Sequence, residues 1–135
     1  MGRNIFLLCA CFFFFTACGT PPPAPEEELT QQQQTIGDLT IAFEGVAVPR
    51  INTSQQFVIT LTDETGQPRD GADVYIDMTM PAMPMGINRP IAEPEGEGRY
   101  VAYSAYTMEG DWEMIVVVRL GDDEYRAVFP VVAVE

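Results

Sequence analysis

Residues 112–120 read WEMIVVVRL, a run in which every second side chain from Trp112 to Leu120 is apolar. The positions between them include Ile115 and Val117, so the middle of the run is apolar on both faces. Alternate side chains of a strand point to opposite faces, and a strand with two apolar faces is typical of the interior of a β-structure. The run therefore predicts a central strand.

Five further segments show the alternation of apolar and polar residues that half-buried strands require. They are residues 39–43, 57–61, 74–80, 99–106 and 125–134. Pro130 indicates that the last segment lies at a sheet edge or a bulge, because proline has no N–H for a central ladder. The pattern predicts an all-β domain over residues 37–135, an immunoglobulin-like antiparallel β-sandwich of about six to seven strands.

Residues 1–17 have the features of a lipoprotein signal peptide. Arg3 supplies a positive start, an apolar run follows from Ile5 to Phe15, and Ala17 precedes Cys18. The apolar run is too short to span a bilayer. We therefore predict that residues 1–17 are removed and that Cys18 becomes the lipidated first residue. Stable attachment then requires more than one acyl chain, which the resemblance to lipoproteins implies.

Residues 18–36 differ in composition from the rest of the chain. They contain PPPAP at residues 21–25, then three consecutive glutamates and four consecutive glutamines. Such a segment buries too little apolar surface to fold, and its proline run favours an extended chain. We expect a disordered tether that holds the domain away from its lipid anchor.

The charge and the residue inventory exclude several classes of function. The chain has 20 acidic and 7 basic residues, and its formal net charge is −13, which argues against a nucleic-acid partner. It contains no histidine and no lysine, so histidine-based triads, histidine zinc sites and Schiff-base chemistry are excluded. The clustered carboxylates at residues 93–97 and 122–124 fall in predicted loops and turns, which do not fix acid–base geometry. We expect that the protein is not an enzyme.

Residues 77–86 read DMTMPAMPMG and place four methionines close together. Thioethers are soft ligands that suit Cu(I), and they are also adaptable fillers of apolar cores. Met78 and Met80 share the face of the apolar residues in their predicted strand, which favours core packing. Met83 and Met85 lie among prolines and a glycine, where a regular ladder cannot continue, and this favours a metal site.

Two residues near the predicted central strand extend this hypothesis. Met108 joins Met80, Met83 and Met85 as a candidate metal ligand. Because the chain offers no other soft donors, we expect any bound ion to be Cu(I) rather than a hard cation. Trp112 is expected to be a large core residue. If its ring lies beside the methionine loop instead, it could cap a Cu(I) ion through a cation–π contact.

Three features together resemble the YtkA-like domain family, and the FixH proteins are similar in outline. These are the methionine- and proline-rich loop after a strand, GRY at residues 98–100 and MEGDWEM at residues 108–114. The resemblance covers residues 37–135. It implies a small extracytoplasmic β-sandwich, often lipid-anchored, with links to copper handling and oxidase assembly in some relatives. Members often place a histidine in or near the loop, and its absence here leaves only a thioether site.

Two functions remain open. The first is a Cu(I)-binding accessory or chaperone domain, anchored by lipid to the bacterial cell envelope and serving a copper-dependent or oxidase-assembly partner. The second is a metal-free interaction module, in which the flexible methionines form an adaptable contact surface for another envelope protein. The position of the methionine sulfurs in the folded domain distinguishes the two.

Overall fold

The computed structural model describes residues 27–83 and 86–135, and these residues form eight β-strands and no helix. The strands are β1 (Leu29–Ile36), β2 (Leu39–Val46), β3 (Gln55–Asp63), β4 (Asp73–Thr79), β5 (Ile91–Gly96), β6 (Arg99–Ser104), β7 (Gly110–Leu120) and β8 (Asp123–Ala133). No helix in the described part of the chain is long and apolar enough to cross a membrane. The all-β prediction is confirmed.

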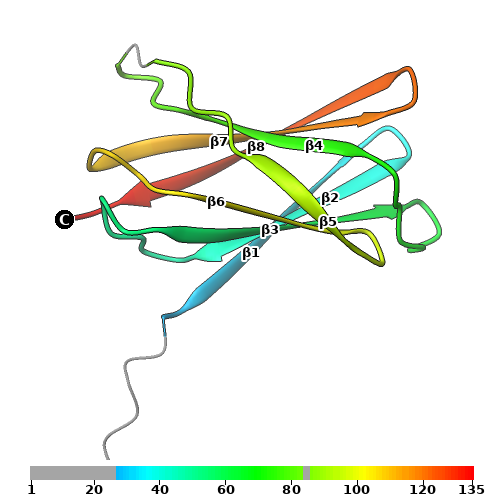
Figure 1. Ribbon diagram of the computed structural model, residues 1–135, viewed down its shortest axis with the longest axis horizontal. Helices are drawn as coiled ribbons and strands as arrows, with labels where there is room; N and C mark the ends of the chain where they lie inside the picture. The colour runs from blue at the N-terminus through cyan, green and yellow to red at the C-terminus, as the bar shows by residue number, and fades with distance from the viewer. Residues whose placement is uncertain (1–26, 84–85) are drawn as a thin grey trace, which may run out of the picture.

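The strands form two layers with antiparallel neighbours, in the order β1-β2-β3-β6-β5-β4-β7-β8. Strands β2 to β8 correspond to A to G of an immunoglobulin constant-type sandwich, because β2-β3-β6-β5 gives the order A-B-E-D and β4-β7-β8 gives C-F-G. Strand β1 is an addition beside β2. In Figure 1, β5 crosses between the layers, where Tyr75 pairs with Ile91. The predicted immunoglobulin-like sandwich is therefore present, with eight strands.

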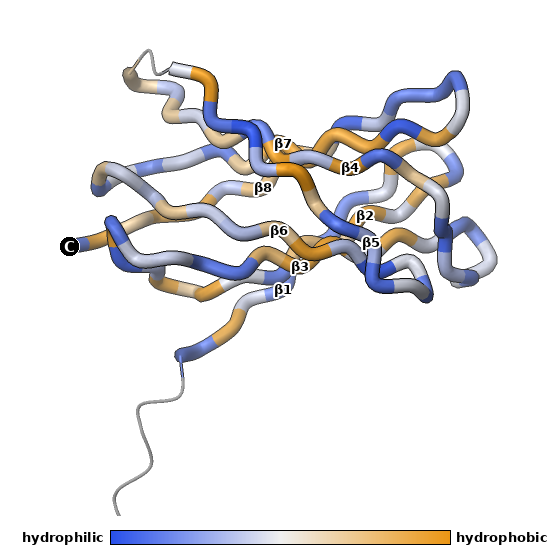
Figure 2. Tube along the Cα trace, in the orientation of Figure 1, coloured by the Kyte–Doolittle hydropathy of each residue, from blue (hydrophilic) through white to orange (hydrophobic). Residues whose placement is uncertain are grey.

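One apolar core fills the space between the layers. Its largest fully buried side chains are Trp112, Tyr100, Tyr106, Phe43, Phe57 and Phe129. The ring of Phe43 stacks against those of Phe57 and Phe129, with centroid distances of 5.8 and 5.4 Å. Figure 2 shows hydrophobic residues along the strands and hydrophilic residues at many of the turns. The alternation read from the sequence thus corresponds to the inward and outward faces of the strands.

Strand β1 corrects the prediction of a disordered tether over residues 18–36 at residues 29–36, while residues 18–26 lie outside the described residues. Residues 29–36 pair with β2 along their whole length, and Ile36 packs against the core. The side chain of Gln34 donates to the carbonyl of Val128 in β8 at 2.5 Å, and that of Gln32 donates to the carbonyl of Pro130 at 3.0 Å. The prediction was wrong here because glutamine-rich composition suggested disorder, whereas these amides bond to a neighbouring strand edge.

Strand β5 is the second element that the sequence pattern did not indicate. Its residues Glu93, Pro94 and Glu95 are exposed, so the segment has no apolar alternation. The strand is held by its neighbours, pairing with β4 at one end and with β6 at the other, where the register shifts between Pro94 and Gly96. The prediction for Pro130 is confirmed, because β8 is the last strand of the sheet order.

Candidate functional site

The end of β4 and the turn that follows it position the first methionines. Val74, Ile76 and Met78 face the core, and Met80 follows in the same alternation. The turn at Pro81 then reverses the chain, and the N–H of Met83 donates to the carbonyl of Met80 at 3.1 Å. Met80 and Met83 form an antiparallel bridge. The bridge places the two methionines opposite each other at this turn, with Met80 packed in the core cluster.

The methionines of this region differ in exposure. Met78 is 1% exposed and Met80 is 8% exposed, and both belong to the core cluster, as their strand pattern predicted. Met83 is 49% exposed. Met85, the fourth methionine of the loop, lies outside the described residues. The turn therefore joins a methionine at the edge of the core to one that solvent reaches.

The connection between β6 and β7 brings a further methionine to the same end of the sandwich (Figure 1). Met108 is partly buried and packs against the core. A Cβ atom added to Gly110 would lie 3.1 Å from the methyl carbon of Met80, so Met80 reaches the start of β7, two residues from Met108. We call the thioethers of Met80, Met83 and Met108 the methionine rim.

Trp112 lies in the core at this end of the sandwich. It is 1% exposed, and its ring makes an edge contact with that of Tyr106, with centroids 5.3 Å apart and an interplanar angle of 77°. The indole N–H donates to the carbonyl of Met108 at 2.9 Å. Burial raises the pKa of the Tyr106 hydroxyl above its ordinary value, because the ionised form would lose its contact with water. Trp112 is the predicted core residue, and its hydrogen bond fixes the backbone of one rim residue.

Asn88 anchors the return of the methionine loop, a role that the sequence analysis missed. Its carbonyl accepts the N–H of Met78 at 3.0 Å, and its side-chain amide lies 3.6 Å from the Met78 sulfur as a donor. The Ser104 hydroxyl contacts the Asn88 amide oxygen at 3.4 Å. An asparagine after a methionine–proline–glycine stretch was a usable signal, because its side chain can satisfy backbone or side-chain groups locally.

Among the described residues, the methionines can be compared with other possible metal ligands. Between residues 27 and 83 and between 86 and 135, no group of three or more His, Cys, Asp or Glu side chains is placed to hold an ion. The candidate soft donors at this end of the sandwich are the thioethers of the methionine rim. Such donors suit a soft, singly charged ion such as Cu(I) rather than a hard divalent cation.

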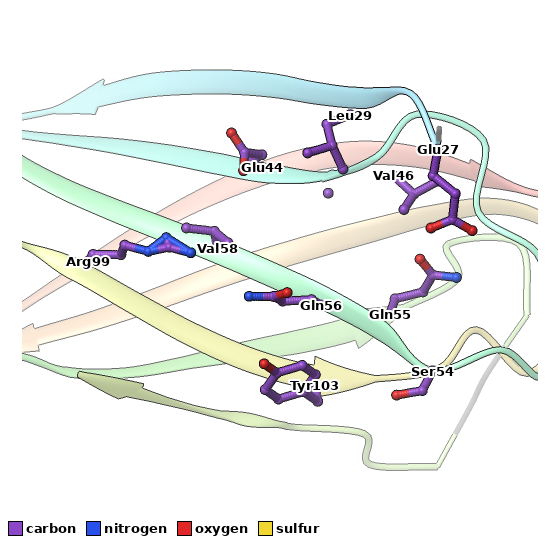
Figure 3. Close-up of a pocket in the computed structure, with 11 residues that line it drawn as sticks. Glu27, Leu29, Glu44, Val46, Ser54, Gln55, Gln56, Val58, Arg99 and Tyr103 are labelled. Atoms are coloured by element: carbon purple, nitrogen blue, oxygen red, sulfur yellow. The ribbon is translucent and has the colours of Figure 1, made fainter. Parts of the chain in front are cut away.

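A separate groove of about 540 Å³ lies on the outer face of the layer that contains β2, β3 and β6 (Figure 3). Its lining residues are Glu27, Leu29, Glu44, Gly45, Val46, Ser54, Gln55, Gln56, Val58, Arg99 and Tyr103. In Figure 3 the side chains of Tyr103 and Gln56 lie across the groove from Leu29. None of the lining residues is a methionine, so this groove is distinct from the rim.

Comparison with known proteins places the chain in a family. A search of curated proteins found no match, and neither did a search of solved structures. The family model described as YtkA-like matches residues 33–117, well over half of the chain. This match includes β2 to β6, the methionine loop and most of β7, and therefore both segments that form the rim. The chain belongs to the YtkA-like family.

Proposed function

We propose that this YtkA-like domain is an extracytoplasmic accessory domain that binds Cu(I) through the methionine rim. The observation that supports the proposal is the Met80–Met83 bridge, which places these two methionines opposite each other, together with the Met80 methyl group beside the start of β7. Met108 lies two residues from Gly110 and would supply a third sulfur. Met85 is a further candidate ligand outside the described residues.

The burial of these residues suits capture and transfer of a soft ion. Met80 is held against Gly110 and the core, so its thioether has few alternative positions. Met83 is 49% exposed and can meet an incoming ion before the other donors do. Three uncharged thioethers give Cu(I) a soft environment without a fixed negative charge, which is compatible with release to a partner that offers stronger ligands.

The competing function is a metal-free interaction module. Two exposed apolar side chains near the loop favour it, because Ile87 is 84% exposed and Met83 is 49% exposed. Flexible methionines can adapt to varied partner surfaces. In this alternative the rim would contact an envelope protein directly, and replacement of sulfur by carbon would have little effect on the contact.

A Cu(I) titration against a chromophoric chelator separates these functions. Met83→Leu combined with Met85→Leu keeps the bulk of both side chains and removes both sulfurs, so we expect at least a tenfold loss of Cu(I) affinity. Met114→Leu is the matched control, because Met114 is fully buried in β7 and is not part of the rim. Affinity unchanged in the double variant, or absent in the parent protein, would overturn the copper proposal.

The pH dependence gives an independent test. A thioether carries no proton that a metal must displace, so the Cu(I) affinity of the rim should stay constant across the range of about pH 5 to 8 in which a histidine site would weaken. The measurement is the same competition titration at several pH values. A steep loss of affinity within this range would contradict a site made of thioethers.

We also propose that the domain is anchored to the cell envelope through lipid on Cys18, which lies outside the described residues. The support is the apolar run before Cys18 and the small residue that precedes it. Mass spectrometry of the mature N-terminus should find an acylated Cys18 as the first residue. An unmodified N-terminus at another position would exclude the anchor.

A further inference from the structure

Arginines gather on the outer face of the β4-β7-β8 layer, away from the methionine rim. The chain has seven basic residues and a net charge of −13, so local positive charge is scarce. Three of its arginines, Arg89, Arg119 and Arg126, nevertheless lie around this face. Two of them flank Tyr75 in β4, because the guanidinium carbons of Arg89 and Arg119 are 6.0 and 5.8 Å from the centre of its ring.

The strand register brings the third arginine to the same place. Tyr75 pairs with Val117 in β7, and Val117 pairs with Arg126 in β8, so the three residues form a row across the layer. Val117 points away from the core yet is fully buried. Neighbouring side chains on this outer face therefore cover Val117. Because Arg126 and Tyr75 flank Val117 in the strand register, the aliphatic stem of Arg126 extends towards Tyr75.

One carboxylate bonds to two of the arginines. The oxygens of Glu124 accept hydrogen bonds from the Nε atoms of Arg119 and Arg126, at 3.0 and 2.9 Å. Arg89 is paired to Asp77 through a terminal nitrogen at 2.9 Å. Because Arg119 and Arg126 use only Nε, their terminal amino groups have no hydrogen-bond partner among the described residues. A guanidinium has five N–H donors, so most of this donor capacity is available to a ligand.

The electrostatics agree with this geometry. Ion pairing with Glu124 raises the pKa of Arg119, and pairing with Asp77 raises that of Arg89, while the positive charge of Arg126 acts on both in the opposite direction. The guanidinium group of Arg126 therefore lies close enough to those of Arg89 and Arg119 to repel them. The nearby carboxylates are Asp77, Glu124 and Asp73, which pairs with Arg119 across the strands, so a bound anion would compete with them for the free N–H donors.

A hollow of about 310 Å³ lies between these groups and is lined by Tyr75, Arg89, Ile91 and Arg119. We propose that this hollow and the neighbouring Arg126 bind the phosphate group of a small ligand or lipid headgroup. Guanidinium forks match phosphate oxygens in geometry, and several arginines around one hollow suit a phosphate better than a single carboxylate. Ile91, which is 70% exposed, offers an apolar contact for the group attached to the phosphate.

The test is an NMR titration of the full-length protein with inorganic phosphate, observing the Nε–H signals of the arginines. We expect saturable shifts at Arg119 and Arg126, and at least a tenfold weaker dissociation constant in Arg119→Gln combined with Arg126→Gln. Arg99→Gln is the matched control, because Arg99 forms a similar exposed ion pair with Glu95 on the other layer. Absence of saturable shifts, or equal binding by the double variant, would overturn the proposal.

A second titration identifies the source of the phosphate. A short-chain phosphatidylglycerol, kept below its micelle concentration, presents the lipid headgroup without a bilayer. Tighter binding of this lipid than of inorganic phosphate, lost in the double variant, would assign the site to a headgroup. Tighter binding of inorganic phosphate, lost in the same variant, would assign it to a soluble phosphate. Binding of either ligand that survives the double substitution would contradict the assignment to these arginines.

Discussion

Trp112 connects the core of the domain to its candidate site. Its ring is buried against Tyr106, and its indole N–H holds the carbonyl of Met108. The same side chain thus contributes apolar burial to the sandwich and a fixed backbone position to one rim residue. A substitution at this position is expected to affect folding before it affects any ligand.

Trp112→Ala should lower the free energy of unfolding by about 3 to 5 kcal/mol, because it leaves a large cavity in the core. Chemical denaturation measures this loss. Val132→Ala is a suitable control, because Val132 is 55% exposed on β8, and we expect a change within about 0.5 kcal/mol there. A loss below about 1 kcal/mol for Trp112→Ala would mean that the ring contributes little to the core.

Gly98 is the second residue that the fold constrains tightly. Its φ is +72°, and a Cβ atom there would lie 2.4 Å from the carbonyl oxygen of Leu61. Its own N–H donates to the Asp70 side chain at 2.8 Å, and its carbonyl accepts the N–H of Leu61 at 2.8 Å. Gly98 therefore joins the β5–β6 turn to β3 at a distance that only glycine permits.

Gly98→Ala should destabilise the domain by more than the cost of positive φ alone, which is about 1 to 2 kcal/mol for a residue with a Cβ. Gly71→Ala isolates that cost, because Gly71 has a similar φ of +79° and no atom within 4 Å of the added Cβ. Thermal unfolding of the two variants should show the larger loss for Gly98→Ala. Equal losses would show that the backbone contact at Leu61 relaxes easily.

At the scale of elements, the predicted and observed strands differ for a physical reason. The six predicted strands bury an alternating apolar face, and residue pattern is sufficient to find such segments. Strand β1 carries mostly polar side chains, and β5 buries only Ala92. Both are strands because neighbouring backbones offer them hydrogen bonds. No local pattern contains that information. The site shows a similar limit, because sequence indicated the methionines but not Asn88 or the Met80–Met83 bridge.

The contact between β1 and β8, made by Gln32 and Gln34, gives a test at the scale of elements. Gln32→Ala combined with Gln34→Ala removes the side-chain hydrogen bonds to β8, and the free energy of unfolding should fall by about 1 to 2 kcal/mol. Hydrogen exchange of the β1 amides should accelerate. Gln31→Ala combined with Gln33→Ala is the matched control, since these residues alternate with the bonded pair. Similar acceleration of hydrogen exchange in both double variants would show that the contact between β1 and β8 does not depend on Gln32 and Gln34.

At the scale of the whole molecule, three surfaces are distinct. The methionine rim lies at one end, where β4 turns and β7 begins. The arginine face covers the β4-β7-β8 layer, and the groove beside Tyr103 lies on the other layer. An immunoglobulin-like sandwich accommodates such separation, because its core is closed by two layers and leaves their outer faces and loops free for function. Substitutions at the rim, where we propose that Cu(I) binds, should therefore leave the arginine face unchanged.

The most direct test of the central claim, that rim thioethers bind Cu(I), is NMR of protein carrying ¹³C-labelled methionine methyl groups. On addition of one equivalent of Cu(I), we predict large shifts of the methyl signals of Met80, Met83 and Met108. The signals of Met78 and Met114, which are buried in the core, should move far less. Unchanged rim signals, or uniform small shifts of all the methionines, would contradict the claim.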